Sequence, residues 1–266
     1  MLRKIELTKR YKIFNFLPFY LLLSICFTAC NSGEKVVPLQ VKQLTQEEVN
    51  QQTNAIEGLV NPEFHKDLKL DLWAVDSLVA DPISLQIDDF GNAIYSKTNR
   101  RKISEFDIRS HQDWEISSIS FKNVEDRKAF IHKELAPENS DKNKWLPDIN
   151  GDGSHDWKDL TIEKENVFKI QDTDGDGRAD RSQLIASDFN QETSDVAGAV
   201  LYHDDALFVG VAPDLWRMTD TNGDGLMDEK KSLAHGFGVH IGFGGHNMSG
   251  LKVGPEGKIY WGIGDI

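Results

Sequence analysis

Apolar and polar side chains alternate along several short stretches of this chain, and a tight polar turn interrupts each stretch. The clearest examples are residues 84–95, 199–209 and 250–261. Alternation with a period of two predicts half-buried strands, and a turn of Asp, Gly or Pro between two such strands predicts a β-hairpin. A shorter alternation at Leu68, Leu70 and Leu72 predicts one more strand near the start of the folded body.

The spacing of the hairpins predicts a repeated unit. The second and third hairpins begin about fifty residues apart, which is the length of one four-stranded propeller blade with its loops. A repeating hairpin at this period favours a β-propeller over a β-sandwich. A blade needs roughly 40–50 residues, so residues 61–266 hold about three to four blades. The sequence therefore predicts an all-β fold, an incomplete β-propeller.

One helix is expected between the first two hairpins, which lie more than twice as far apart as the second and third. Within residues 122–135, Val124, Ile131 and Leu135 fall on one face of a helix, and Pro137 ends the pattern. We therefore predict a short helical insertion around residues 122–135, within a propeller domain of residues 61–266.

The first 29 residues have the pattern of an export signal. Basic residues precede an apolar run that ends in Phe27-Thr28-Ala29-Cys30, and this ending resembles a bacterial lipoprotein box. We predict a lipoprotein signal peptide at residues 1–29 and lipidation of Cys30. The lipid would hold the protein in the bacterial cell envelope, on the periplasmic or surface side of the outer membrane. The alternative is a membrane anchor, but the run is short for a span of about 20 residues.

Residues 30–60 are polar and poor in aromatic side chains. This composition predicts a flexible tether between the lipid and the folded body. Within it, Thr45 followed by Glu48 resembles a capping box, which would start one short helix.

Charge and cysteine content narrow the classes of partner. The formal net charge is −13, and the predicted signal peptide is basic, so the mature body is more acidic still. An acidic body argues against binding to nucleic acid and to anionic lipid surfaces, and it suits the binding of cations. Both cysteines, Cys26 and Cys30, lie in the export segment, so the sequence predicts neither a disulfide nor a thiol ligand in the mature body.

Three nine-residue loops share one pattern of oxygen-bearing side chains and glycines. Side-chain oxygens stand at positions 1, 3, 5 and 9, a backbone carbonyl is available at position 7, and glycines at positions 4 and 6 allow sharp turns. Calcium takes about six to eight oxygen ligands, and alternate residues of a tight loop supply them. The predicted ligand positions are Asp148, Asn150, Asp152, Ser154 and Asp156 in the first loop, Asp172, Asp174, Asp176, Arg178 and Asp180 in the second, and Asp220, Asn222, Asp224, Leu226 and Asp228 in the third.

These loops are not EF-hands, because position 12 lacks the bidentate glutamate and is Asp159, Gln183 or Lys231. They resemble the shorter calcium loops on β-hairpins of other propeller families, and plain acidic turns are the alternative. The second loop carries aspartate where the other two have asparagine at position 3, so we expect it to bind calcium most tightly. The expected role is structural, because bound calcium would hold together carboxylates that otherwise repel one another.

Glycine and histidine are concentrated near the C-terminus, where His235, His240 and His246 lie within twelve residues. A histidine side chain can act as a general base near neutral pH, it can bind a metal, or it can hydrogen-bond loop backbone. We favour the hydrogen-bonding role for His235 and His240. His246 directly precedes the third hairpin and is the candidate for chemistry. The glycines do not form a dinucleotide-binding fingerprint.

The segment that starts at His246 resembles a known motif. Residues 246–260, His-Asn-Met-Ser-Gly-Leu-Lys-Val-Gly-Pro-Glu-Gly-Lys-Ile-Tyr, followed by Gly264-Asp265, are similar to the His-Asn-Gly-Gly-Arg-Leu…Gly-Pro-Asp-Gly…Gly-Asp segment of the soluble glucose/sorbosone dehydrogenases. The resemblance implies a six-bladed propeller with pyrroloquinoline quinone and calcium, in which His246 takes a proton from a sugar hydroxyl while hydride passes to the quinone. Gly250 stands where that motif has arginine.

Most of the remaining sequence resembles the membrane-bound dehydrogenase branch of the same superfamily, which is abundant in planctomycetes and related bacteria. Residues 136–147, the three acidic loops and residues 209–216 carry this likeness, which extends over nearly all of residues 61–266. Members often continue into helical repeats and a haem-binding Cys-x-x-Cys-His domain. The resemblance implies that this chain is an N-terminal fragment that is inactive by itself.

Together these features predict a lipid-anchored, calcium-stabilised protein that oxidises a sugar-like substrate, with a quinone as hydride acceptor and a c-type haem as a further electron acceptor. Two alternatives stay open. One is a non-catalytic cell-surface module that binds glycans or proteins, and the other is a scaffold for a downstream haem domain. Uptake of a quinone would favour the enzyme, whereas glycan binding without turnover would favour the binding module.

Overall fold

The computed structural model describes residues 40–60, 62–63, 65–101 and 105–264. Residues 37–266 form one compact unit, and every element named below belongs to it. The predicted signal peptide at residues 1–29 and the predicted lipidation of Cys30 lie outside the described residues. Within the described residues, no helix combines the length and the apolar character that crossing a lipid bilayer requires.

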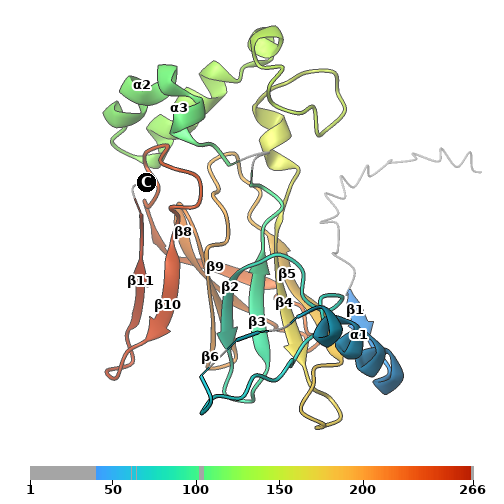
Figure 1. The fold of residues 1–266 in the computed structure, drawn as a ribbon. Coiled ribbons are helices and arrows are strands. Elements are labelled where there is room, and N and C mark those ends of the chain that lie inside the picture. The colour runs from blue at the N-terminus through green and yellow to red at the C-terminus, as the bar shows by residue number, and fades with distance from the viewer. Residues whose placement is uncertain (1–39, 61, 64, 102–104, 265–266) are drawn as a thin grey trace, which may run out of the picture. The chain divides into compact units, whose positions relative to one another are not determined.

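Five antiparallel strands form the first sheet, in the order β1-β5-β4-β3-β2 (Figure 1). They are β1 (Val41–Gln43), β2 (Pro82–Ile87), β3 (Ala93–Lys97), β4 (Glu165–Gln171) and β5 (Arg181–Asp188). β2 and β3 form the hairpin predicted for residues 84–95. Asp88 stabilises its turn by accepting hydrogen bonds from the amides of Phe90 and Asn92, as aspartate commonly does in tight turns.

Four strands form the second sheet, in the order β6-β7-β8-β9, and two more form a third. They are β6 (Ala199–His203), β7 (Ala206–Val211), β8 (Asp214–Thr219), β9 (Glu229–His235), β10 (Ser249–Val253) and β11 (Ile259–Gly262). The pairs β6–β7 and β10–β11 are the other two predicted hairpins. Asp204 and Asp205 connect β6 to β7 with φ of 48° and 54°, as both central residues of a type I′ turn require.

An edge strand of each sheet, β2, β6 or β10, lies next to an edge strand of a neighbouring sheet. The amide of Val200 in β6 donates a hydrogen bond to Ser84 Oγ of β2. The amide of Tyr202 donates to Gln86 Oε1 of the same strand, and β6 also contacts β10. The all-β class is confirmed, because the chain forms mostly antiparallel sheets with few helices. The described sheets show no closed propeller, so the propeller and its number of blades stay predictions.

Residues 41–59 belong to the folded unit, so the flexible tether predicted for residues 30–60 is wrong over this part. β1 pairs with β5 at one edge of the first sheet. Helix α1 (Gln46–Leu59) follows it and starts at the predicted capping box. There Glu48 accepts a hydrogen bond from the amide of Thr45, and Thr45 Oγ1 accepts one from the amide of Glu48.

An apolar stripe explains why α1 is part of the fold. Val49 and Thr53 of this helix are buried, and Ile56 packs against the same cluster of apolar side chains. That cluster includes Tyr95 of β3 and Ile170 of β4. One stripe on an otherwise polar helix is enough to hold it against a sheet, and the average polarity of the segment concealed the stripe.

The helical insertion lies between β3 and β4 and contains the predicted helix. Helix α3 (Val124–Glu134) is followed by Leu135, and Val124, Ile131 and Leu135 are buried as predicted. The insertion is longer than predicted, because Trp114 and other aromatic side chains give it a core of its own. Its further elements are α2 (Glu115–Ser120), η1 (Ile108–Ser110), η2 (Gln112–Trp114), η3 (Pro137–Lys142) and η4 (Trp157–Thr161).

Hydrogen bonds join the insertion to the loop that precedes β10. Ser118 Oγ accepts a bond from the amide of Ile241 (2.9 Å), and Arg127 Nη1 donates to the carbonyl of Gly238 (2.7 Å). Through these bonds the insertion contacts the segment that carries the candidate histidines.

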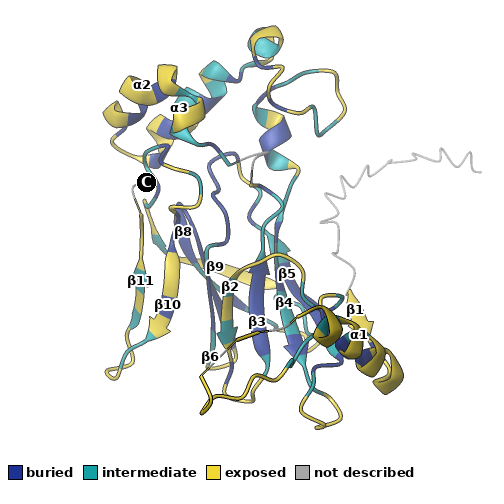
Figure 2. Cartoon of the chain, in the orientation of Figure 1, coloured by how far each residue is buried: buried dark blue, intermediate teal, exposed yellow. Residues whose placement is uncertain are grey.

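Figure 2 shows that β3 is buried whereas α1 and α2 expose much of their surface.

The strand predicted from Leu68, Leu70 and Leu72 does not form, since these described residues have no strand hydrogen bonding. Leu68 and Leu70 are each 64% exposed. Alternation produces a strand only where a neighbouring strand supplies the hydrogen bonds, and no strand pairs with this segment.

Candidate functional site

The three acidic loops adopt one conformation. In each loop the aspartate at position 1 accepts hydrogen bonds from the amides of the glycines at positions 4 and 6. For Asp172 the donors are Gly175 (2.7 Å) and Gly177 (2.9 Å), and Asp148 and Asp220 accept the same pair of bonds in their own loops. All six glycines have φ between 71° and 91°. Glycine is needed at these positions because other residues rarely adopt that conformation.

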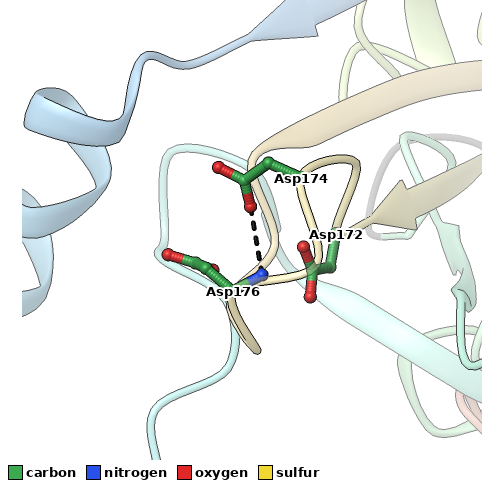
Figure 3. Close-up of side chains that lie close together, drawn as sticks. All are labelled: Asp172, Asp174 and Asp176. Atoms are coloured by element: carbon green, nitrogen blue, oxygen red, sulfur yellow. Dashed lines mark hydrogen bonds between the residues drawn. The ribbon is translucent and has the colours of Figure 1, made fainter.

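Asp172, Asp174 and Asp176 lie close enough together to hold a cation (Figure 3). One carboxylate oxygen of each lies within 4.8 Å of the others. Asp174 accepts a hydrogen bond from the amide of Asp176 (3.2 Å), which fixes its side chain over the loop. Calcium–oxygen distances of about 2.3–2.6 Å place two ligands of one ion up to about 5 Å apart, so these residues fit calcium. Elsewhere in the described part of the chain, no other group of three His, Cys, Asp or Glu side chains has this spacing.

The electrostatics of Asp172 also suit a metal ligand. Desolvation would raise the pKa of its carboxyl, but the amides of Gly177 and Gly175 outweigh this effect and hold the pKa below its usual range. The carboxylate is therefore ionised at neutral pH, as calcium binding requires.

The aspartate at position 9 joins the two ends of the loop. Asp180 accepts hydrogen bonds from the amide (3.0 Å) and the hydroxyl (2.6 Å) of Thr173. Asp228 accepts the same pair from Thr221. In the first loop, where position 2 has no hydroxyl, its amide donates to Asp159 at position 12 instead. The sequence pattern does not indicate this bracing role, and metal ligation by position 9 stays a prediction.

Helix α1 contacts the second loop from outside. Gln46 Nε2 donates to Asp176 Oδ2 (2.6 Å), and Arg178 Nη1 donates to Asn50 Oδ1 (3.1 Å). The partners lie 130 and 128 positions apart in the sequence, so no local pattern could indicate them. Any ion held by this loop would therefore also stabilise the docking of α1.

His246 lies at an open cavity of about 530 Å³ beside the start of β10. Its side chain is exposed, and its ring stands edge-on to Phe243 at 5.5 Å between centroids. The charged residues that line the cavity with it are Arg101 and Glu105. The structure thus places His246 where a small ligand has room.

Glu105 positions the turn that carries His246. Its Oε1 accepts hydrogen bonds from the amide of Gly245 (3.0 Å) and from Nδ2 of the buried Asn247 (2.9 Å), on either side of the histidine. No motif singled out Glu105, because it lies 140 positions before Gly245 and became a neighbour only through folding.

Gly250 has a conformational reason to be glycine. Its φ is +68°, and a Cβ added there would meet no neighbouring atom within 4 Å. The backbone conformation, not lack of space, disfavours an arginine at this position. The backbone is irregular there because the register of β10 against β11 shifts between Ser249 and Lys252.

The other two histidines hydrogen-bond the surrounding structure. His240 Nδ1 donates to the backbone carbonyl of Ser118 (2.7 Å), so its partner is backbone, as predicted, but the backbone of helix α2 and not of a loop. His235 Nδ1 instead lies 3.0 Å from the carboxylate of Asp214, so its partner is a side chain and not the loop backbone.

A group of buried charges adjoins the His246 cavity. Asp195 precedes the cavity-lining Val196, and it lies near Arg127 and Arg100. All three charged side chains are buried. Burial raises the pKa of Asp195 to about 6, with Glu105 adding to the rise and the two arginines opposing it.

Asp195 is expected to make stability depend on pH. Its pKa is higher in the folded than in the unfolded protein. Its contribution to the stability of the folded state is therefore full below about pH 4 and is lost as pH rises through about 6. A shift of about 2 units corresponds to about 3 kcal/mol. The amide that Asp195→Asn introduces stays neutral at every pH. The melting temperature of this variant minus that of the wild type should therefore increase from pH 4 to pH 7 in thermal scans. A difference that is constant across this range would contradict the shifted pKa.

Comparison with known proteins gives one match. A family model described as a domain of unknown function (DUF7133) matches residues 55–266. No curated protein and no solved structure matches the chain significantly.

Proposed function

This chain belongs to the DUF7133 family, and we propose that it is a lipid-anchored, calcium-stabilised propeller module of the quinoprotein sugar and alcohol dehydrogenase type. In the full-length protein, His246 accepts the hydroxyl proton of a sugar-like alcohol, and the carbon that bears this hydroxyl gives up its hydride to a two-electron acceptor. The observation that carries this proposal is the position of His246, which Glu105 fixes at a cavity large enough for a small substrate.

In this proposal His246 acts as a general base. An imidazole placed beside a substrate hydroxyl accepts its proton as the C–H bond breaks, and such general base catalysis contributes about 10²–10⁴-fold to a rate. The hydrogen bonds from Gly245 and Asn247 to Glu105 hold the backbone on both sides of the histidine. Fixing that backbone keeps the base in a constant position relative to a bound hydroxyl.

Pyrroloquinoline quinone does not fit the described lining of this cavity. That cofactor carries three carboxylates, whereas the lining residues offer the guanidinium of Arg101 together with the carboxylate of Glu105. Positive charge for a trianion is therefore lacking among them. The quinone therefore stays a prediction from the resemblance.

The charge of the cavity favours a second candidate function, a cell-surface module that binds glycans or proteins without turnover. A cavity with balanced charge and several uncharged polar residues, Thr98, Asn247 and Ser249 among them, suits a neutral hydroxylated ligand. This candidate needs no cofactor.

Two features of the fold support the wider proposal. β2, β6 and β10 are edge strands of the three sheets, and β6 contacts both of the others, as the inner strands of successive propeller blades do. The Asp172 cluster supplies oxygens with the spacing of a calcium site. We propose calcium for this loop first and for the Asp148 and Asp220 loops as weaker sites.

A dye-reduction assay tests the catalytic proposal. The full-length protein is supplied with calcium and pyrroloquinoline quinone and assayed with aldoses and an artificial electron acceptor. His246→Ala should lower kcat/KM by at least about 100-fold, because it removes the base. His203→Ala changes a histidine on β6 that does not line the cavity and should leave the activity unchanged.

Two results would decide against the enzyme. Activity that survives His246→Ala would remove this residue from catalysis. Glycan binding without any dye reduction or quinone uptake would establish the binding module instead.

A further inference from the structure

The cavity at His246 is the first of three adjoining hollows. The second, of about 400 Å³, shares Arg101 and Glu105 with the first. The third, of about 500 Å³, shares Ser110, His111 and Trp145 with the second. Each hollow by itself falls within the range of about 300–1,000 Å³ that holds one small ligand. The shared lining residues make the three hollows neighbours, in a row from the His246 cavity to the helical insertion.

Trp145 stands at the junction of the second and third hollows and is unusually exposed for a tryptophan. Its relative exposure is 46%, whereas the next residue, Leu146, is fully buried. The exposed ring is nevertheless held in place, with His111 at 4.5 Å and Trp114 at 6.0 Å between ring centroids. Trp145 is not part of the buried apolar cluster of the insertion. A fixed aromatic surface facing solvent between two hollows is suited to stacking against a ligand.

Polar side chains that flank Trp145 are also held in fixed orientations. Asn143 Nδ2 donates to the carbonyl of Glu134 (2.9 Å), and Asn139 Nδ2 donates to the carbonyl of Lys133 (2.9 Å). Both asparagines line the third hollow. Their amides are oriented before any ligand arrives, which reduces the entropy lost on binding.

The charges along the path are mixed in sign. Asp107 and Arg109 line the second hollow and form an ion pair with each other, and Asp113, Glu134 and Lys142 line the third. A phosphorylated or strongly anionic ligand would meet carboxylates in every hollow. A neutral ligand with many hydroxyls can pair with both carboxylates and amines.

We propose that the three hollows form one groove for a neutral saccharide chain of several units, with Trp145 as the platform on which one sugar ring stacks. The C–H face of a pyranose ring packs on an aromatic ring, and its hydroxyls hydrogen-bond the fixed polar side chains beside it. The chain lies along the groove with one end in the His246 cavity. The placement of that end rests on the proposed function, whereas binding at Trp145 does not.

The test measures binding of the full-length protein to gluco-oligosaccharides of one to six units, with β-1,4 and with α-1,4 linkages, by isothermal titration calorimetry. At least one series should bind more tightly with length, with the hexamer at least tenfold tighter than glucose. Trp145→Ala should abolish most of this gain, and Trp145→Phe, which keeps an aromatic face, should retain part of it. Ile116→Ala alters an exposed apolar residue of α2 that lines none of the hollows and should change nothing. Melting temperatures of all variants verify that they are folded.

The outcomes separate this inference from the proposed function. Equal affinity for glucose and the hexamer in both series, no binding in either, or a length gain that survives Trp145→Ala would each overturn the groove. Length-dependent binding without oxidation of any saccharide would leave the groove standing and remove the dehydrogenase. Oxidation of glucose without a gain in affinity from added sugar units would support the dehydrogenase and overturn the groove.

Discussion

Chelation of calcium is expected to lower the melting temperature of the folded protein by about 5–10 °C for each loop that is occupied. An ion bound only by the folded state, at about 100 times its Kd, stabilises that state by about 2.7 kcal/mol. A protein of this size loses about 2–4 °C for each kcal/mol. The physical cause is repulsion, because Asp172, Asp174 and Asp176 lie together in one tight loop and only a cation neutralises them.

Matched variants separate ion binding from a general effect of chelators. Asp174→Asn should weaken the calcium response of the second loop, since it removes a charged ligand and keeps the shape of the side chain. Asp89→Asn changes an exposed aspartate in the β2–β3 turn, outside the three loops, and should respond to chelation like the wild type. Calorimetric scans with and without calcium give the measurement. A melting temperature indifferent to calcium would make the three loops ordinary acidic turns.

Replacement of Arg100 by methionine is expected to lower the free energy of unfolding by about 3–5 kcal/mol, the cost of breaking a buried charged network. Arg100 is fully buried. Its guanidinium donates to four backbone carbonyls, two before β4 and two in the segment between β5 and β6. The acceptors are Leu160, Glu163, Gln191 and Ser194. Methionine fills a similar volume but leaves all four carbonyls without this donor.

Two further variants distinguish the bonding geometry of Arg100 from its charge. Arg100→Lys keeps the charge, but its single ammonium cannot reach four carbonyls in two directions, so most of the loss should persist. Arg217→Met alters a half-buried arginine on β8 and should change stability by less than about 0.5 kcal/mol. Denaturant titration measures all three. A loss for Arg100→Met as small as that for Arg217→Met would show that the network contributes little.

The sequence by itself determined the local features of this protein: its hairpins, its turns and the buried face of one helix. Alternating side chains around Asp- and Gly-rich turns predicted three hairpins that all form, since such turns need only nearby residues. The loop pattern predicted sharp turns at its paired glycines, and Gly175 and Gly177 both have positive φ. The helical face through Val124 and Ile131 was likewise visible in the sequence and is buried.

Tertiary structure alone decided the rest, because contacts between distant residues leave no local pattern. Docking of α1 depends on its buried stripe and on the second acidic loop, more than a hundred positions away. Glu105 supports the His246 turn across 140 positions. The second and third hollows meet at Trp145 only after the insertion has folded over the loop before β10. Leu68 and Leu70 also show that a strand depends on distant residues, since no described strand pairs with their segment and it forms none. The sequence thus determined the turns and metal-type loops, and folding determined what surrounds His246.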